Sequence, residues 1–573
     1  MNHLTRIYSI IPKNKIKYFY YLIFLVFISV LLETVGIGLI YPLIKIINTE
    51  QVNINSYLPT VFNPLSRFYQ NLSLNKKEII VVYVLIITFL FILKFLIQLV
   101  CSFLFSKFLS LAVSDISNKF YNYYLERPFS HSSKNDSSKE MNIIINKIAI
   151  VSNDCFYALI NIIPEIFILF TLLILLFLIN YKIIFFVIIL LIVVFFIFII
   201  LKKYLIKIGE LRIRHFSKVI QLLQEGFSGL LEIKLFGIEN KFLQKFNFHN
   251  TQRIYAERKF NFINTSQRIV VEFLFAVGFL IYLFFYVINN QDISQLVPIF
   301  ALYTIAMVRV LPSVHRIIYN FNRIINAESS SKFVYSQLKF INKVNKNISK
   351  KNNINFNELL VKDLYFRYSK EDKYLFNKFN FKISKGDIVG IVGDSGRGKT
   401  TFLKIILGLL IPEKGGVFLN KKNINLNLKN WHSLASYVSQ TPYFINDTIQ
   451  KNIILGSKKS FNKDNYLNAV KFAAINDFIN KLSNKGDTIV GERGLRLSQG
   501  QKQRICLARI FYLKPKLIIL DESTSALDDN TEKVILQNLR NLNKKERTTI
   551  IIVSHRESAL KICKKIININ KFK

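Results

Sequence analysis

The stretch Leu497-Ser498-Gln499-Gly500-Gln501 lies between two halves of a nucleotide site. Upstream, residues 393–400 read GDSGRGKT, which is a complete G-x-x-x-x-G-K-[ST] phosphate loop. Downstream, residues 517–522 read LIILDE, an apolar strand that ends in two carboxylates. A phosphate loop alone predicts only a nucleotide-binding protein, so the order of all three motifs decides the fold.

In this order the three motifs resemble the ATP-binding cassette of ABC transporters. The resemblance implies an α/β domain of the P-loop type that binds ATP and Mg²⁺ and hydrolyses the nucleotide. The chain ahead of the cassette is then the part that ATP drives. We therefore expect a multi-domain membrane protein, with an all-α transmembrane domain of six helices followed by the α/β cassette.

The phosphate loop stands in the local context that the motif requires. It follows an apolar strand, residues 388–392, and opens a helix predicted over 400–409. Glycines let backbone N–H groups approach the phosphates, and the helix N-terminus adds a favourable partial charge. Lys399 is expected to reach the β- and γ-phosphates, and the Thr400 hydroxyl to bind Mg²⁺. The predicted nucleotide contacts of the loop are Gly393, Asp394, Ser395, Gly396, Arg397, Gly398, Lys399, Thr400 and Thr401.

Four further side chains complete the predicted hydrolytic site. Asp521 ends the buried strand and is expected to bind Mg²⁺ directly or through water. Glu522 is placed to polarise the attacking water. By resemblance, Gln440 fits the loop that senses Mg²⁺ and this water and contacts the membrane half, and His555 fits the loop that steadies the γ-phosphate. We predict Glu522, His555 and Gln440 as catalytic, and Thr400, Gln440 and Asp521 as metal ligands.

The resemblance also implies contacts to adenine and to a second cassette. Tyr368 lies about 25 residues before the phosphate loop, where the family stacks an aromatic ring on adenine, with Tyr365 as the alternative. Residues 525–528, SALD, match the loop that crosses to the opposite subunit. Residues 491–494, GERG, resemble a loop specific to exporters, which favours an exporter over an importer.

The signature carries Gln499 as its third residue, whereas the commonest family sequence is LSGGQ. In the family the γ-phosphate contacts come from the hydroxyl and backbone that correspond here to Ser498 and Gly500, so we expect little loss. We predict nucleotide contacts from Ser498, Gln499, Gly500 and Gln501. In the family each ATP lies between the phosphate loop of one cassette and the signature of another. The chain therefore requires a second copy of itself, or a related half-transporter in its place, and a homodimer with two working sites is the simpler prediction.

The composition of the 573 residues divides into two parts. Long runs of Ile, Leu, Phe and Val fill the first part, whereas the chain after about Ser330 is rich in Lys and Asn. We predict a transmembrane domain over 1–330, a linker over 331–354 and the cassette over 355–573. The net charge of +41 could suggest nucleic acid. However, Lys and Arg crowd the segments that flank apolar spans, as the positive-inside rule expects, so no nucleic-acid partner is predicted.

Six apolar stretches are long enough to cross a bilayer, whose core of about 30 Å needs about 20 residues of helix. Positive charge concentrates in the loops after the second and fourth stretches, residues 107–147 and 202–259, and is missing from 289–292. Both long loops, both termini and the cassette are therefore expected on the cytoplasmic side of a bacterial inner membrane. The predicted spans are Tyr18–Ile46, Ile79–Ser106, Ala158–Asn180, Ile183–Leu201, Ile269–Ile288 and Ile293–Leu311.

The two long loops match those of ABC exporters, where they continue the helices and end in short transverse helices that press on the ATPase. We expect these coupling segments near Ser130–Glu140 and Gln224–Gly237, with Gly226 and Gly229 permitting a tight turn. After the first span, residues 63–72 predict a short helix with one apolar stripe. That helix would lie on the outer leaflet, close the outer mouth or pack on the span ends.

Three basic residues in or beside the spans are candidates for substrate binding: Lys94, Arg268 and Arg309. Together they would form a cationic belt suited to an anionic group such as a lipid phosphate or pyrophosphate. Two structural alternatives stay open. The side chains can reach water at the cytoplasmic edge. Carboxylates can also neutralise them, since Glu272 lies four residues after Arg268 and Glu33 could pair with any of the three.

Residues 33–42, ETVGIGLIYP, and 309–313, RVLPS, look like segments of the bacterial lipid-linked oligosaccharide flippase of protein N-glycosylation and its glycolipid-exporting relatives. Those proteins also carry basic residues in the second, fifth and sixth spans and a short external helix after the first. Lys94 stands where arginine is more usual, which weakens bidentate recognition of phosphate there.

The sequence thus predicts a homodimeric ABC exporter that hydrolyses ATP to flip a lipid-linked, glycosylated and anionic substrate outward. A general lipid, multidrug or peptide exporter is the alternative within transport. A peptide processor-exporter is less favoured, because fewer than 20 residues precede the first span and no protease domain fits. A non-transport ABC ATPase acting on nucleic acid is disfavoured by the six spans.

Overall fold

The computed structural model describes residues 3–48, 76–129, 137–179, 181–288, 296–344, 355–369 and 371–571. Contacts divide the chain into two compact units. The first, called the membrane unit here, comprises Met1–Arg127 and Asn135–Lys346, and the second, the cassette unit, comprises Pro128–Lys134 and Asn347–Lys573. The predicted outer helix at 63–72 and the first part of the predicted coupling segment Ser130–Glu140 lie outside the described residues.

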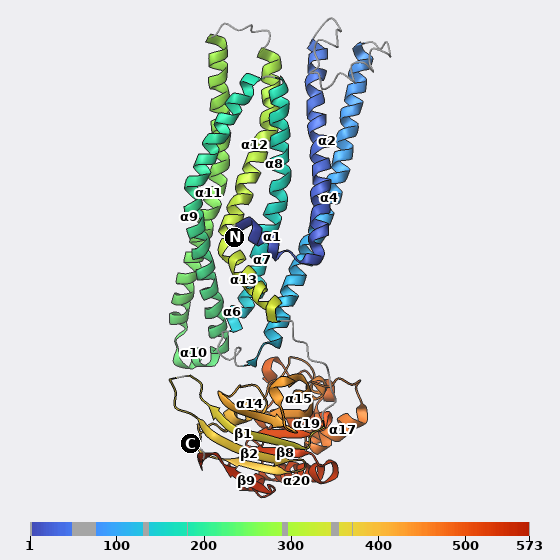
Figure 1. Ribbon diagram of the computed structural model, residues 1–573, viewed down its shortest axis with the longest axis vertical. Coiled ribbons are helices and arrows are strands. Elements are labelled where there is room, and N and C mark those ends of the chain that lie inside the picture. Colours follow the sequence, from blue (N-terminus) through green and yellow to red (C-terminus); the bar gives the residue numbers. More distant parts are fainter. Residues whose placement is uncertain are drawn as a thin grey trace. The chain divides into compact units, whose positions relative to one another are not determined.

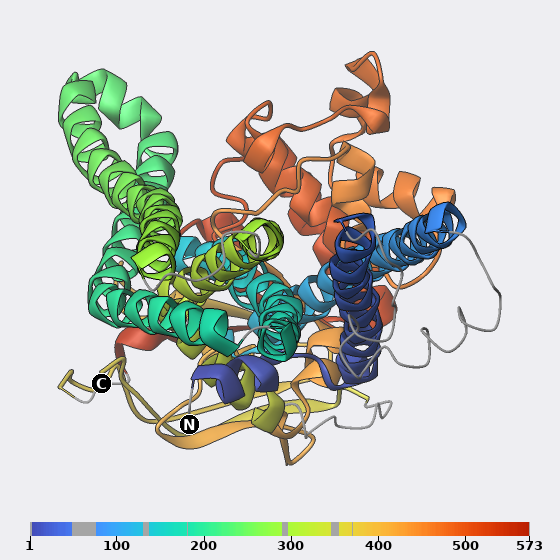
Figure 2. The same ribbon diagram turned by 90° about the horizontal axis from the view of Figure 1, so that it is seen from above.

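Long helices build the membrane unit (Figure 1). They associate in pairs, α2 with α4, α8 with α12 and α9 with α11, and Figure 2 views them roughly end-on. The long helices are α2 (Ile16–Asn48), α4 (Lys76–Glu126), α8 (Tyr157–Ile179), α9 (Tyr181–Ser228), α11 (Glu239–Ile288) and α12 (Leu296–Asn326). The shorter segments are α1 (His3–Ile10), η1 (Lys13–Lys15), α6 (Ser137–Asn142), η4 (Ile143–Lys147), α7 (Ile148–Ile150), η5 (Val151–Phe156), α10 (Leu230–Phe236) and α13 (Glu328–Val344).

Five stretches of helix among the described residues are long and apolar enough to cross a membrane. The sixth predicted span, 293–311, begins outside the described residues and continues in α12. Several helices are much longer than a bilayer requires. Helix α4, for example, has 51 residues and rises about 77 Å, whereas the hydrocarbon core is about 30 Å thick. The two long basic loops are therefore largely helical continuations of the spans, as predicted. The five stretches are Lys13–Ile40, Lys77–Glu126, Glu140–Ile174, Ile188–Ser228 and Glu239–Phe285.

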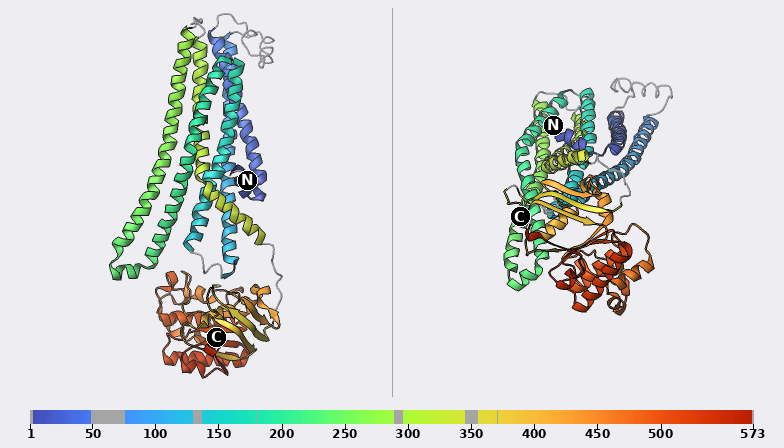
Figure 3. Two further views of the ribbon diagram at one scale, coloured as in Figure 1. Left: turned by 60° about the vertical axis from the view of Figure 1, so that its left-hand side comes forward. Right: turned by 60° about the horizontal axis from the view of Figure 1, so that its bottom comes forward.

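The second predicted coupling segment forms a turn with a short helix of its own. Helix α10 connects the ends of α9 and α11, which the left view of Figure 3 shows as a long hairpin. The expected turn at Gly226 is wrong, because that residue continues α9. The chain turns instead at Gly229, which precedes α10, and at Gly237, which ends it with φ 61°. Glycine takes this left-handed conformation at little cost.

Helix α13 occupies much of the segment 331–354 that the sequence predicts as a linker. The segment is rich in Lys and Asn, which hides its apolar stripe. Val334, Leu338 and Ile341 recur at helical spacing and are all buried, and α13 packs with α1.

Two sheets form the cassette unit. One is antiparallel with the order β2-β1-β4-β5, and the other is parallel with the order β6-β7-β8-β3-β9. The strands are β1 (Glu358–Phe366), β2 (Phe376–Ser384), β3 (Ile388–Val392), β4 (Lys414–Leu419), β5 (Lys422–Asn423), β6 (Ala435–Val438), β7 (Leu517–Asp521), β8 (Thr549–Val553) and β9 (Lys565–Asn568).

Helices and 3-10 turns complete this unit. The helices are α14 (Lys399–Ile406), α15 (Leu428–Leu434), α16 (Ile449–Ile454), α17 (Lys463–Phe472), α18 (Asn476–Lys481), α19 (Gln499–Leu513), α20 (Asp529–Glu546) and α21 (Glu557–Leu560). The 3-10 turns are η7 (Ile424–Leu426), η8 (Lys485–Asp487), η9 (Glu492–Gly494) and η10 (Ile569–Lys571). The all-α membrane unit and the α/β cassette confirm the predicted fold class.

The parallel sheet positions the nucleotide motifs. Strand β8 lies between β7 and β3, and all three strands run in the same direction. Their carboxyl ends therefore meet at one edge, which is where open α/β sheets bind ligands. The phosphate loop follows β3, Asp521 ends β7 and His555 follows β8, so one sheet edge brings together residues more than 100 positions apart.

We predict that Gly415→Ala destabilises the cassette by roughly 3 kcal/mol. Gly415 has φ 76°, and an added Cβ would lie 2.0 Å from the Asp363 carbonyl oxygen of the paired strand. Gly456→Ala is the matched control, since Gly456 has φ 91° but its Cβ would meet only Leu513 at 3.7 Å. Thermal unfolding of the purified full chain measures both, and equal losses for the two variants would contradict the clash.

Candidate functional site

The phosphate loop curves around the ammonium group of Lys399. Lys399 Nζ donates to the carbonyl oxygens of Gly393 at 2.6 Å and Asp394 at 3.2 Å, and to His555 Nε2 at 3.0 Å. Gly398 has φ 93° and immediately precedes α14, and a Cβ there would lie 2.8 Å from Leu375. The positive φ favours glycine here, and a larger residue would also have to displace the Leu375 side chain, so the loop shape suits the residue that the motif specifies.

A hydroxyl and a carboxylate oxygen meet where the sequence predicts Mg²⁺. Thr400 Oγ1 donates to Asp521 Oδ2 at 3.0 Å, and the Tyr437 hydroxyl donates to the same oxygen at 3.0 Å. Burial raises the pKa of Asp521 above the ordinary aspartate value, and the two hydrogen bonds oppose that shift. Hard oxygen donors of this kind fit Mg²⁺, which keeps several waters besides one or two protein ligands.

Two of the other predicted catalytic residues lie next to the Glu522 carboxylate. Gln440 Nε2 donates to Glu522 Oε2 at 2.8 Å, and His555 Nε2 lies 3.6 Å from Glu522 Oε1. The Glu522 backbone has φ 49°, a left-handed conformation that is uncommon outside glycine. A strained conformation persists only where its surroundings hold it in place, and such conformations cluster at functional sites. The candidate water-polarising carboxylate is thus fixed by its backbone and by an amide from another strand end.

The signature begins helix α19. Ser498 Oγ accepts from the Gln501 backbone N–H at 3.3 Å, while Gln501 Oε1 accepts from the Ser498 N–H at 2.9 Å. This capping box leaves Gln499 as the first helical residue, where glycine is not required by the backbone. Gly500 lies close to the next motif, since a Cβ there would come within 2.9 Å of the Ala526 carbonyl oxygen.

The structure adds residues that the sequence analysis missed. Gln503 is almost fully buried, and it binds the Glu522 carbonyl at 3.4 Å and the Ala526 N–H at 3.1 Å. Glu532 accepts hydrogen bonds from Thr524, Arg556 and Ser558 at 2.8–2.9 Å. Tyr437 is the third omission, although it lies three residues before Gln440. The position of Tyr437 in the strand that pairs with β7, which ends in Asp521, was the available signal.

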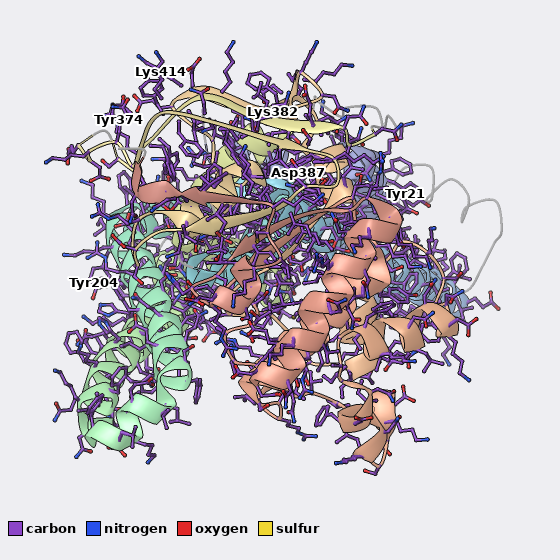
Figure 4. All side chains as sticks on the ribbon, turned by 90° about the horizontal axis from the view of Figure 1, so that it is seen from below. Tyr21, Tyr204, Tyr374, Lys382, Asp387 and Lys414 are labelled. Atoms are coloured by element: carbon purple, nitrogen blue, oxygen red, sulfur yellow. The ribbon has the colours of Figure 1, made fainter. Side chains whose placement is uncertain are left out.

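Tyr368 lies beside the phosphate loop. Its hydroxyl is 2.8 Å from Thr401 Oγ1 while 56% of the residue is exposed, which leaves ring surface free for an adenine. The adjacent Arg367 is fixed by two hydrogen bonds to Glu413, at 2.7 and 2.9 Å. Its guanidinium also stacks on Tyr374, which Figure 4 labels near Lys414 on the antiparallel sheet. Tyr365, the alternative, packs its ring edge-on against the same Tyr374.

In the membrane unit, two of the three candidate substrate-binding cations share one carboxylate. Glu33 is 6% exposed, and its Oε1 lies 3.0 Å from Lys94 Nζ and 2.8 Å from Arg309 Nε. Arg309 Nη2 also donates to Glu33 Oε2 at 2.8 Å. Arg268 is not part of this cluster, because it pairs with Glu272 at 2.7 Å and its side chain is 64% exposed. The expected belt of three cations is therefore reduced to Lys94 and Arg309 around Glu33.

Comparison with known proteins bears on both units. A family model of the ABC transporter transmembrane region matches residues 20–310, and the ABC transporter model matches residues 376–525. The chain belongs to the ABC transporter family. In this family the membrane domain is joined to a cassette that binds and hydrolyses ATP, and ATP supplies the phosphates and the cleavable bond at the site described above.

Three known proteins illustrate how far the likeness extends. The chain is 37% identical over 215 residues to the leukotoxin translocation ATP-binding protein of Mannheimia glucosida, and 37% over 211 residues to the alpha-hemolysin translocation ATP-binding protein of Escherichia coli O157:H7. Each match covers 37% of this chain and 30% of the relative. A bacterial Atm1-family ABC exporter with ATP bound shares the fold, with a TM-score of 0.77, 19% identity, and coverage of 97% of this chain and 93% of the other.

We predict that Tyr437→Phe moves the acidic limb of the ATPase pH profile to higher pH. The tyrosine hydrogen bond stabilises the charged form of Asp521, so its loss raises the pKa of that carboxyl further. Because a protonated Asp521 is a poorer Mg²⁺ ligand, activity then fails at a higher pH than in the wild type. Hydrolysis rates at limiting Mg²⁺ measure the shift, and an unchanged or lower midpoint would contradict it.

We also predict that Glu522→Gln lowers ATP hydrolysis by roughly a hundredfold to ten-thousandfold. The amide keeps the shape of the side chain but removes the base that orients water. Binding of a fluorescent ATP analogue is the control and stays close to wild type. A variant that still hydrolyses ATP at more than a tenth of the wild-type rate would assign the base to another residue.

Proposed function

We propose that the chain is an ATP-driven exporter that works as a dimer in a bacterial inner membrane, with its cassette in the cytoplasm. The contacts of Glu522 with Gln440 and His555 support this most directly, because they join the hydrolytic motifs into one site. The signature of the same chain forms no hydrogen bond to the phosphate loop among the described residues, which agrees with a second copy supplying it.

The cassette residues divide the work of hydrolysis. Lys399 and the loop N–H groups would hold the phosphates, and Thr400 with Asp521 would hold Mg²⁺. Glu522, oriented by Gln440, accepts a hydrogen bond from water, and His555 lies between Glu522 and Lys399. Closure of two cassettes is then transmitted to the membrane helices, for which α10 is the described candidate.

We infer that the substrate is amphipathic and carries an anionic group. Lys94 and Arg309 share the single carboxylate of Glu33, so the cluster keeps one net positive charge inside the predicted spans. Charge at such a depth is costly, so its presence points to a function. A lipid-linked oligosaccharide with a phosphate or pyrophosphate linkage has this chemistry, and it is the specific substrate that we propose.

Export of a protein or peptide is the second candidate. It is favoured by the relatives, whose names describe translocation of leukotoxin and alpha-hemolysin. Substrate charge separates the two candidates, since a polypeptide needs no single anionic group at the Glu33 cluster.

We predict that Arg309→Ala reduces flipping of a polyprenyl-pyrophosphate-linked oligosaccharide in liposomes by about tenfold, the cost of one charge-assisted hydrogen bond. Arg309→Lys retains more activity because the charge remains. Arg268→Ala is the matched control, and it stays within about twofold since its side chain is exposed and paired with Glu272.

Glu522→Gln in the same liposomes sets the level of flipping without hydrolysis. Equal losses in Arg309→Ala and Arg268→Ala would contradict a role for the Glu33 cluster. ATPase activity that is indifferent to the glycolipid but rises with a secretion-signal peptide would favour the protein exporter.

A further inference from the structure

Three arginines recur at intervals of seven residues along α12, at positions 309, 316 and 323. Seven residues advance a helix by about 10.5 Å and turn it almost twice, so the three lie on one face. We call them the arginine row. Each guanidinium contacts a carboxylate from another helical segment. The pairs are Arg309–Glu33 at 2.8 Å, Arg316–Glu165 at 2.7 Å and Arg323–Asp154 at 2.8 Å.

The last pair of the row has excess positive charge. Asp154 Oδ1 contacts Arg323, and its Oδ2 also lies 3.7 Å from Arg212 Nη2. Two guanidinium groups thus face one carboxylate. The rings of Tyr157 and Tyr319 lie 5.3 and 5.7 Å from the Arg323 guanidinium and hold it in place.

Beside the Arg323–Asp154 pair lies a cavity of about 350 Å³, a volume large enough for a small ligand. Four cationic and two anionic side chains line it, so the lining has a net charge of about +2. These charged residues are Lys147, Arg212, Arg253, Arg323, Asp154 and Glu257. Asn142 and Asn146 add neutral hydrogen-bonding groups to the lining.

Arg253 supplies a second observation that points to a ligand. Its Nε is buried and has no hydrogen-bond partner in the part of the chain that the structure describes. The guanidinium packs over the Phe216 ring at 5.5 Å, which fixes its plane without satisfying an N–H group. A buried donor without an acceptor is costly. Because Arg253 lines the cavity, an anion bound there would take hydrogen bonds from the other N–H groups of the same guanidinium.

We propose that this cavity binds a phosphate group through Arg253, Arg212 and Arg323. Guanidinium forks match the oxygens of phosphate, and the excess charge favours a dianion. The site is distinct from the Glu33 cluster, because Arg323 follows Arg309 by about 21 Å along α12. A lipid headgroup and a soluble phosphate share this chemistry.

Titration calorimetry with inorganic pyrophosphate tests the site, using the full chain in phosphatidylcholine nanodiscs. Lys399→Ala is present throughout, so that the phosphate loop does not compete. We expect pyrophosphate binding that Arg253→Gln weakens by about tenfold or more. Arg258→Gln is the matched control, because Arg258 lies on α11 like Arg253 and also packs over an aromatic ring, that of Tyr255, but does not line the cavity. The absence of binding, or equal affinities in the two variants, would overturn the proposal.

Arg323→Lys is a second probe, since it keeps the ion pair with Asp154 but loses the fork, and it should also weaken binding. Nanodiscs with phosphatidic acid identify the source of the phosphate. If phosphatidic acid lowers the apparent pyrophosphate affinity only when Arg253 is intact, a lipid headgroup occupies the cavity. If the affinity is unchanged, the cavity binds soluble phosphate. The assay requires neither hydrolysis nor transport, so its failure is separate from a failure of the proposed function.

Discussion

Charges within the spans of a membrane protein must be paired, and this constraint organises the membrane unit. Glu33 lies on α2, Lys94 on α4 and Arg309 on α12, so a single buried carboxylate joins three helices. Removing the shared carboxylate would leave two cations without a counter-charge, which costs several kcal/mol, whereas removing one cation leaves a neutral pair. The cluster therefore links the position of these helices to the charge of whatever enters between them.

The carboxylates of the nucleotide site in the cassette also need partners. Asp521 and Glu522 are adjacent carboxylates at the end of a buried strand, and each is held by hydrogen bonds from other elements. The parallel order of β7, β8 and β3 makes this possible, because it brings three strand ends to one edge. Gln503 then joins the signature helix to the backbone carbonyl of Glu522, the candidate water-polarising residue.

Motifs with a local mechanism could be predicted from the sequence. The phosphate loop specifies its glycines and lysine through backbone geometry, and the apolar runs specify spans through length alone. Pairings between distant residues could not be predicted, because Glu33 had three possible cations and only packing selects two of them. The composition around α13 predicts a linker, whereas an apolar stripe in this lysine-rich segment forms a helix. Tyr437 was missed since its role depends on the neighbouring strand.

We propose that the membrane unit selects a substrate by its anionic group and couples that choice to hydrolysis. The most direct measurement compares the ATPase rate of the full chain in neutral nanodiscs with polyprenyl phosphate and with the polyprenol of the same length. The two lipids differ only in the phosphate group. We expect polyprenyl phosphate to stimulate hydrolysis and the polyprenol not to. Equal stimulation by both lipids, or by neither, would rule out selection by the anionic group.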